Sequence, residues 1–210
     1  MELLSLHNKE RQRGMDKFNI YKEGLDLQFA IDACMQRGRI WHMKKGEVFE
    51  LVGEPARWMG FIKTGYLKYV AHNEVDGKDY SMAFVFEGEL AGDYPFCFYG
   101  GMSDVSIVAG EDCTLYVMEG AEFNLLFEES IDTMRAGKQF AEHLFIQAYT
   151  RVLNFYRTDA KTRYIGLLQR CPHVVKKLPL LEIASYLRVT PTTISKIRKG
   201  LSEENKSFEE

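Results

Sequence analysis

The amino-acid sequence predicts an α+β protein: an N-terminal β roll of the double-stranded β-helix or jelly-roll type, a long helix and a C-terminal helix-turn-helix. From residue 39 onward, short runs rich in Val, Ile, Phe, Tyr and Trp are separated by Gly and Asp, which indicates about seven strands. Residues 121–157 lack proline and repeat apolar side chains at helical spacing. Residues 180–199 place apolar side chains where two short crossed helices need them.

Composition favours an ordinary soluble protein of one or two domains. The 210 residues are 46% hydrophobic and 27% charged. The longest run without Asp, Glu, Lys or Arg is residues 94–103, whereas a membrane span needs about 20 apolar residues. The N-terminus becomes charged before a secretory core develops. We expect a cytoplasmic protein without a membrane partner, whose four scattered cysteines are reduced thiols.

Charge is distributed unevenly along the chain. Residues 1–160 hold 17 basic and 25 acidic residues, whereas residues 161–199 hold nine basic residues and one acid, Glu182. This pattern indicates an acidic body joined to a polyanion-binding module, although a basic face that is merely solvated gives the same count. In chain order, we expect an extension (1–23), an effector domain (24–128), a dimerisation helix (129–157), a helix-turn-helix domain (158–201) and an acidic tail (202–210).

The N-terminal half is predicted from local signals. Residues 25–36 space apolar groups like a short helix that ends before Gly38. Glycines at 46, 53 and 65 mark turns between the strands that follow. No helical segment lies between these strands, so a parallel, doubly wound sheet is excluded.

The long helix carries an apolar seam with alternating steps of four and three residues. Its members are Ala141, Phe145, Ala148, Val152 and Phe155. Such a seam needs a partner surface. A second copy of the chain is the partner we expect, and packing on the chain's own β domain is the alternative.

The C-terminal segment fits a helix-turn-helix at each core position. A helix over 160–170 follows the cap Thr158-Asp159, and Pro172 ends it. The expected core residues of the motif are Ile183, Ala184, Val189, Ile194 and Ile197. Thr190 is suited to cap the second helix and Pro191 to its first position. Arg188 stands where this turn usually carries glycine, at a cost of about 1 kcal/mol.

In this geometry the second helix enters the major groove of DNA. The candidate DNA-binding residues are Thr190, Pro191, Thr192, Thr193, Ser195, Lys196, Arg198 and Lys199. Lys196 can donate to guanine O6 and N7, and the threonine hydroxyls can reach bases or phosphates. Arg198 and Lys199 suit phosphate contacts, which position a protein on DNA without reading sequence.

With these elements in this order, the chain resembles the Crp-Fnr family of bacterial transcription regulators. The resemblance covers about residues 24–200, and its motifs in the β part are KKGEVFELVGEPARWMGFIKTGYLKYV and FEGELAGDY. It implies a homodimer formed through the long helix, a palindromic DNA operator, RNA polymerase as a further partner and a small-molecule effector in the β roll.

The resemblance also implies where an effector would bind. Its candidate pocket consists of Gly88, Glu89, Leu90, Ala91, Ser103, Asp104 and Tyr149. Gly88 to Ala91 match the start of the family's phosphate-binding cassette. Ser103-Asp104 stands where cyclic-nucleotide-binding members have an Arg-Ser or Arg-Thr pair, so we expect that cAMP is not the effector. The aromatic segment 94–99 leaves two alternatives: it lines a pocket for an apolar ligand, or its rings fill that pocket.

Other functional classes have weaker support. An iron–sulfur sensor would need clustered N-terminal cysteines, and only Cys34 lies in that region. A haem sensor of the same family stays open, because one axial His or Cys suffices. A cupin-type metalloenzyme would need a His-x-His pair, which the sequence lacks. A signalling module that does not bind DNA is a further alternative. The sequence predicts no catalytic residue and no metal site, and it identifies no cofactor.

Overall fold

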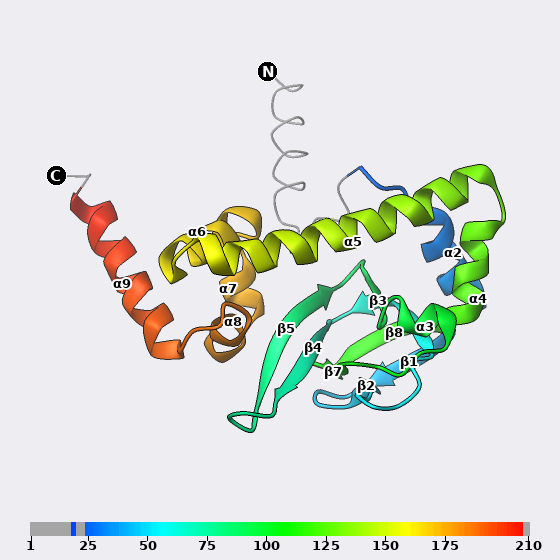
Figure 1. Ribbon diagram of the computed structural model, residues 1–210, viewed down its shortest axis with the longest axis horizontal. Helices are drawn as coiled ribbons and strands as arrows, with labels where there is room; N and C mark the ends of the chain where they lie inside the picture. The colour runs from blue at the N-terminus through cyan, green and yellow to red at the C-terminus, as the bar shows by residue number, and fades with distance from the viewer. Residues whose placement is uncertain (1–17, 20–23, 208–210) are drawn as a thin grey trace, which may run out of the picture. The chain divides into compact units, whose positions relative to one another are not determined.

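The computed structural model describes residues 18–19 and 24–207, and it divides into two compact units (Figure 1). The β-roll unit ends at Ile146, and the helical unit comprises the chain from Gln147 onward together with Phe18 and Asn19. Of the predicted extension 1–23, only Phe18 and Asn19 lie among the described residues. No described helix is long and apolar enough to cross a membrane.

The β-roll unit consists of two four-stranded sheets, with strand orders β1-β8-β3-β6 and β2-β7-β4-β5. The strands are β1 (Arg39–Met43), β2 (Val48–Glu50), β3 (Trp58–Thr64), β4 (Tyr66–Asn73), β5 (Lys78–Phe86), β6 (Leu90–Ala91), β7 (Ser106–Ala109) and β8 (Cys113–Glu119). All of their pairings are antiparallel, which confirms the predicted β roll. Alternating side chains such as Ile62, Leu67 and Ile107 are fully buried in one apolar core.

The turn between β3 and β4 requires its glycine. Gly65 has φ +85°, and a Cβ there would lie 2.7 Å from the carbonyl oxygen of Asp112. Gly46 and Gly53 also have positive φ, so all three predicted turn glycines take a left-handed conformation that other residues rarely adopt.

Short helices cover one end of the roll and bury Phe98 of the aromatic segment, while Tyr99 stays exposed. They are α2 (Gln28–Arg37), α3 (Phe96–Tyr99), α4 (Gly120–Leu125) and the 3₁₀ turn η2 (Leu126–Glu128), and α2 and α4 lie beside β3 and β8 (Figure 1). The Phe98 ring lies 5.1 Å from the Tyr94 ring and 5.8 Å from the Phe123 ring, centroid to centroid. These rings belong to the core between the sheet and the helices. Of the two alternatives for this segment, the structure favours rings that fill the space.

Helix α5 (Ile131–Arg157) is the predicted long helix. It begins with a reciprocal cap, because the Thr133 N–H donates to the Ser130 hydroxyl at 3.1 Å and the Ser130 N–H donates to the Thr133 hydroxyl at 3.0 Å. Of the predicted seam, Phe145, Ala148 and Val152 are exposed, while Ala141 is partly buried. Phe155 turns toward the arginines of the helical unit, and the exposed apolar line on α5 continues instead to Tyr156.

The helical unit contains α6 (Ala160–Arg170), α7 (Val174–Lys177), α8 (Leu180–Tyr186) and α9 (Pro191–Ser207). The Asp159 carboxylate caps α6 as expected, accepting the Thr162 N–H at 2.8 Å. The basic segment 173–179 that follows Pro172 includes the single turn α7. Helix α9 passes its expected end at residue 199 and includes residues 202–207 of the predicted acidic tail. That segment contains no proline, which would end the helix. In addition, the Lys199 Nζ atom lies 3.8 Å from a carboxylate oxygen of Glu203, one turn further along.

Candidate functional site

The turn between α8 and α9 has the hydrogen bonds of a Schellman motif. The Val189 N–H donates to the Ala184 carbonyl and the Arg188 N–H donates to the Ser185 carbonyl, each at 3.0 Å. Arg188 occupies the position after the C-cap, with φ +56°. The residue that departs from the usual glycine therefore adopts the left-handed conformation for which glycine is preferred.

Arg188→Gly is expected to raise the free energy of unfolding by about 0.5–1 kcal/mol, because the relieved strain exceeds the extra entropy of an unfolded glycine. Urea unfolding at fixed pH measures this change. Arg188→Ala is the matched control, since it removes the same charge and keeps a Cβ in the strained position. Equal stability changes in the two variants would show that charge, and not backbone conformation, is responsible.

The two helices of this motif share a dry core. Ile183, Ala184, Leu187 and Ile194 are all buried. The Thr190 hydroxyl accepts the Thr193 N–H at 3.1 Å and thereby caps α9. Val189 and Ile197 are partly buried, consistent with the predicted packing.

The outer face of α9 carries most of the candidate DNA-binding side chains. Thr192, Ser195, Lys196 and Lys199 are exposed. Within the described part of the chain, neither Thr192 nor Lys196 has a side-chain hydrogen bond or ion pair. Arg198 differs, because its Nε donates to the Tyr164 hydroxyl at 2.7 Å and holds α9 against α6. The Arg198 guanidinium is therefore already bound to Tyr164, and a phosphate would have to bind its remaining nitrogens.

The candidate effector residues are divided between the units. Glu89, Leu90, Ala91 and Ser103 are buried in the β-roll unit, while Asp104 is exposed. Gly88 has φ +78° in the turn before them. A Glu89 carboxylate oxygen accepts the Phe86 N–H at 2.8 Å, so it supports its own turn. Tyr149 is exposed on α5 and belongs to the helical unit.

Buried carboxylates already occupy the hydrogen-bond donors near the predicted cassette. An Asp93 carboxylate oxygen accepts the Ser103 hydroxyl at 2.6 Å and the Asp104 N–H at 3.1 Å. Glu50 accepts the N–H groups of Arg57 and Trp58 with one oxygen and that of Asp93 with the other. The donors that a phosphate would need are therefore engaged by internal anions, which would also repel it.

Burial raises the pKa of Asp93 above its ordinary value, against the opposing hydrogen bonds from Ser103 and Asp104. A carboxyl group with a raised pKa in the folded state favours folding below its unfolded pKa. That contribution is lost as the pH rises through the folded pKa. Ionised Asp93 should therefore cost stability at neutral pH.

Asp93→Asn is expected to raise the melting temperature at pH 7 by about 2–4 °C, because the amide oxygen can still accept both bonds without a buried charge. Calorimetry between pH 4 and pH 8 should show the gain shrinking toward acid. Glu87→Gln removes an exposed carboxylate from the same unit and serves as the control. A gain independent of pH would contradict the charge argument.

The cysteines are buried thiols, not exposed thiolates. Burial raises the pKa of Cys34 to about 12 and raises the pKa of Cys97 and of Cys113. Thiols of this kind are protonated near neutral pH and react slowly. Among the described residues, no group of three His, Cys, Asp or Glu side chains could hold a metal ion. His7, one of the isolated histidines of the sequence, lies outside the described residues.

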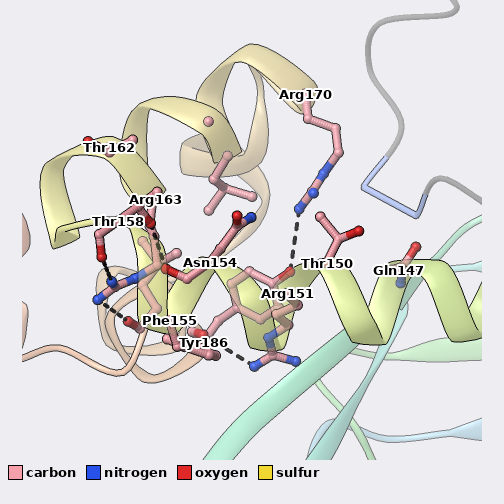
Figure 2. Close-up of a pocket in the computed structure, with 13 residues that line it drawn as sticks. Gln147, Thr150, Arg151, Asn154, Phe155, Thr158, Thr162, Arg163, Arg170 and Tyr186 are labelled. Carbon is pink, nitrogen blue, oxygen red and sulfur yellow. Dashed lines mark hydrogen bonds between the residues drawn. The ribbon is translucent and has the colours of Figure 1, made fainter.

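Sequence reasoning missed a concave site in the helical unit. Arg151, Arg163 and Arg170 line it, together with Tyr186 (Figure 2). The sequence also did not predict that Phe18, in the expected extension, is buried. Its ring centroid lies 5.0 Å from that of Tyr186. The count of basic residues in 161–199 included two of the three arginines, but nothing in their spacing showed that they converge.

Comparisons with known proteins agree with this architecture. Residues 40–130 match the family described as cyclic nucleotide-binding domain. No curated protein sequence matches the chain. Among solved structures, FixK2 from Bradyrhizobium japonicum is 18% identical with a TM-score of 0.69, over 80% of this chain and 86% of that one.

Two other structures show the same fold at similar identity. The regulator CLP from Xanthomonas campestris is 15% identical with a TM-score of 0.61, over 84% of this chain and 92% of that one. A CooA variant from Carboxydothermus hydrogenoformans is 16% identical with a TM-score of 0.61, over 80% and 77% of the two chains. Residues 40–130 are thus similar to the cyclic nucleotide-binding domain family, and the chain shares the fold of these solved structures.

Proposed function

We propose that this chain is a homodimeric, sequence-specific DNA-binding transcription regulator and not an enzyme. Its recognition helix is α9, which enters the major groove of each half-site of a palindromic operator. In such dimers the half-sites lie about 34 Å apart, one turn of DNA. RNA polymerase is the further partner that this role implies.

The outer face of α9 is the observation that supports this proposal most. Thr192 and Lys196 project from a helix whose opposite face is buried through Ile194. A lysine at this place can donate to guanine, and Lys199 lies near enough to contribute a phosphate contact. The net positive charge of residues 161–199 gives the electrostatic attraction that any DNA-binding domain needs.

Helix α5 supports the dimer. Phe145, Tyr149 and Val152 recur at steps of four and three residues and are more than half exposed. Apolar side chains in this pattern favour a helix of the same kind as partner. Two-fold pairing along α5 would also match the symmetry of a palindromic operator.

The β roll is proposed to sense something other than cAMP. In support, Asp93 and Glu50 engage the hydrogen-bond donors beside the predicted cassette with the chain's own carboxyl groups. CLP is described as responsive to c-di-GMP, and another structural neighbour, CprK, was solved in complex with OCPA, so this fold accommodates different effectors. Haem stays a candidate effector, which an absorption spectrum of the purified protein would reveal.

Selection from random duplex DNA by the purified full chain tests the proposal. We expect enrichment of an inverted repeat with wild-type protein, at fixed salt concentration, with and without added cell extract as a source of effector. Failure to enrich any sequence under both conditions would contradict sequence-specific binding. Metal analysis of the same protein tests the cupin-type alternative, which non-haem iron or manganese at one equivalent per chain would support.

A further inference from the structure

The helical unit contains a pocket of about 250 Å³ between α5, α6 and α8 (Figure 2). Arg151 comes from α5, Arg163 and Arg170 come from α6, and Tyr186 closes the pocket from the end of α8. Asn154, Thr150 and Thr162 add neutral polar groups to the wall. All of these residues lie within one compact unit.

Three positive charges face this pocket without a carboxylate partner. Among the described residues, none of Arg151, Arg163 and Arg170 forms an ion pair. Asp159 caps α6, and its pKa is lowered mainly by its bond to Thr162 and to a lesser degree by Arg163. It is exposed and is not among the residues that line the pocket.

Neutral groups fix the orientation of the guanidinium groups. Arg163 donates to the Thr158 carbonyl at 2.6 Å and to the Leu187 carbonyl at 3.4 Å. Arg151 donates to the Tyr186 carbonyl at 3.3 Å, and its guanidinium carbon lies 4.3 Å from the centre of the Tyr186 ring. These contacts orient the side chains and leave their charge uncompensated.

Each of the three side chains also has an unused donor. The Nε atoms of Arg151, Arg163 and Arg170 are buried, and none of them has a hydrogen-bond partner among the described residues. Arg170 is held least, with one bond of 3.4 Å to the Tyr186 hydroxyl, visible in Figure 2. Buried donors on charged groups are costly when left without an acceptor, so these atoms add to the cost of holding three positive charges together.

The electrostatics of the pocket point to an anion. Burial is the main cause that lowers the pKa of Arg151; Tyr186 opposes it, and weaker repulsion from Arg170 and Arg188 adds to the lowering. Arginine remains protonated despite such a shift, so the mutual repulsion persists until a negative charge enters. Guanidinium groups pair with phosphate oxygens in a bidentate geometry that a single lysine cannot reproduce.

We propose that this pocket binds a small phosphate-bearing metabolite as a second ligand site, separate from the β roll. Its volume is below the roughly 300–1,000 Å³ of pockets that hold drug-sized ligands, which favours a compact anion. A ligand there would connect α8 to α5 and α6. On the proposed function, α8 is the first helix of the DNA-binding motif, so occupancy would alter the affinity of α9 for its operator.

Calorimetric titration of the full chain without DNA tests the site. The probes are inorganic phosphate and glycerol 3-phosphate, with sodium chloride at equal ionic strength as the reference. We expect saturable binding of at least one phosphate probe and none of chloride. Because no DNA is present, the outcome is independent of whether the chain proves to be a DNA-binding regulator. Heats that match chloride for both probes would overturn the proposal, whatever the variants do.

Arg170→Gln is the informative variant, because Arg170 holds no main-chain carbonyl and its loss should leave the fold intact. We expect at least a tenfold weaker affinity for the phosphate probe, in keeping with the loss of a charged hydrogen-bond donor. Arg157→Gln removes one charge from the exposed end of α5 outside the pocket and should change affinity by less than about twofold. Equal weakening in both variants would mean non-specific attraction and would overturn the assignment.

DNA is a second source of phosphate groups, and competition separates the two. A short duplex of random sequence, added to protein already loaded with glycerol 3-phosphate, should leave that ligand bound. The duplex backbone is too bulky to enter a recess of this size. Coupling through α8 would change the ligand's affinity only up to a plateau at saturating duplex. Displacement that continues in proportion to duplex concentration would show that the arginines contact the DNA backbone, and the small-molecule site would then be rejected.

Discussion

Phe145→Glu is expected to convert the proposed dimer of the full chain into monomers at micromolar concentration. Phe145 is 66% exposed on α5, in line with the exposed Val152 seven residues on. Burying one such ring is worth about 2–3 kcal/mol, and a two-fold interface contains the position twice. The dissociation constant should therefore rise by a factor of about 10³–10⁴, with an added penalty for burying the new carboxylate.

Sedimentation equilibrium measures this change directly. Gln139→Glu is the matched control, because it adds one negative charge to an exposed position of the same helix, about 120° around its axis from Phe145. The control should keep the mass of the wild type. A Phe145→Glu protein with unchanged mass would mean that the exposed face of α5 is not the dimer interface.

Lys196→Ala should have the largest effect on sequence recognition. Its ammonium group is exposed on α9 and engaged by no side chain that the structure describes. A lysine that donates to guanine contributes about 1–3 kcal/mol, so operator affinity should fall by about five- to 150-fold for each half-site. Selection from random duplex DNA should show relaxed preference at one base pair of each half-site.

Lys199→Ala separates base recognition from charge. Lys199 is also exposed on α9, with Glu203 as a distant partner at 3.8 Å. Its loss should weaken binding to all sequences alike and flatten the dependence of affinity on salt. If both variants lost the same affinity and kept the same preferred sequence, the assignment of Lys196 to a base edge would be wrong.

The proposed regulator thus has two places where a ligand could act, and they differ in charge. In the β roll, the carboxyl groups of Asp93 and Glu50 engage hydrogen-bond donors beside the predicted cassette. In the helical unit, Arg151, Arg163 and Arg170 place positive charge around a recess. An anionic effector would therefore be attracted to the helical unit and repelled by the roll.

Local features of the fold followed from the sequence, because they depend on residues close together along the chain. The alternating runs predicted the strands, and the spacing from Ile183 to Ile197 predicted the helix-turn-helix. The unusual residue of its turn, Arg188, was identified from position alone, and its φ of +56° agrees. Capping by Asp159 and Thr190 followed equally from short-range hydrogen bonding.

Contacts between elements were decided only by the tertiary structure. The sequence could not show that Asp93 engages Ser103, that Phe98 fills the core, or that α6 directs two arginines toward Arg151 of α5. It also placed Phe155 on the exposed seam, whereas that ring lies 5.2 Å from the Arg163 guanidinium. Periodicity fixes where a side chain points relative to its own helix or strand. Which neighbours it meets depends on how the elements pack, and that packing minimises a free energy summed over the whole unit.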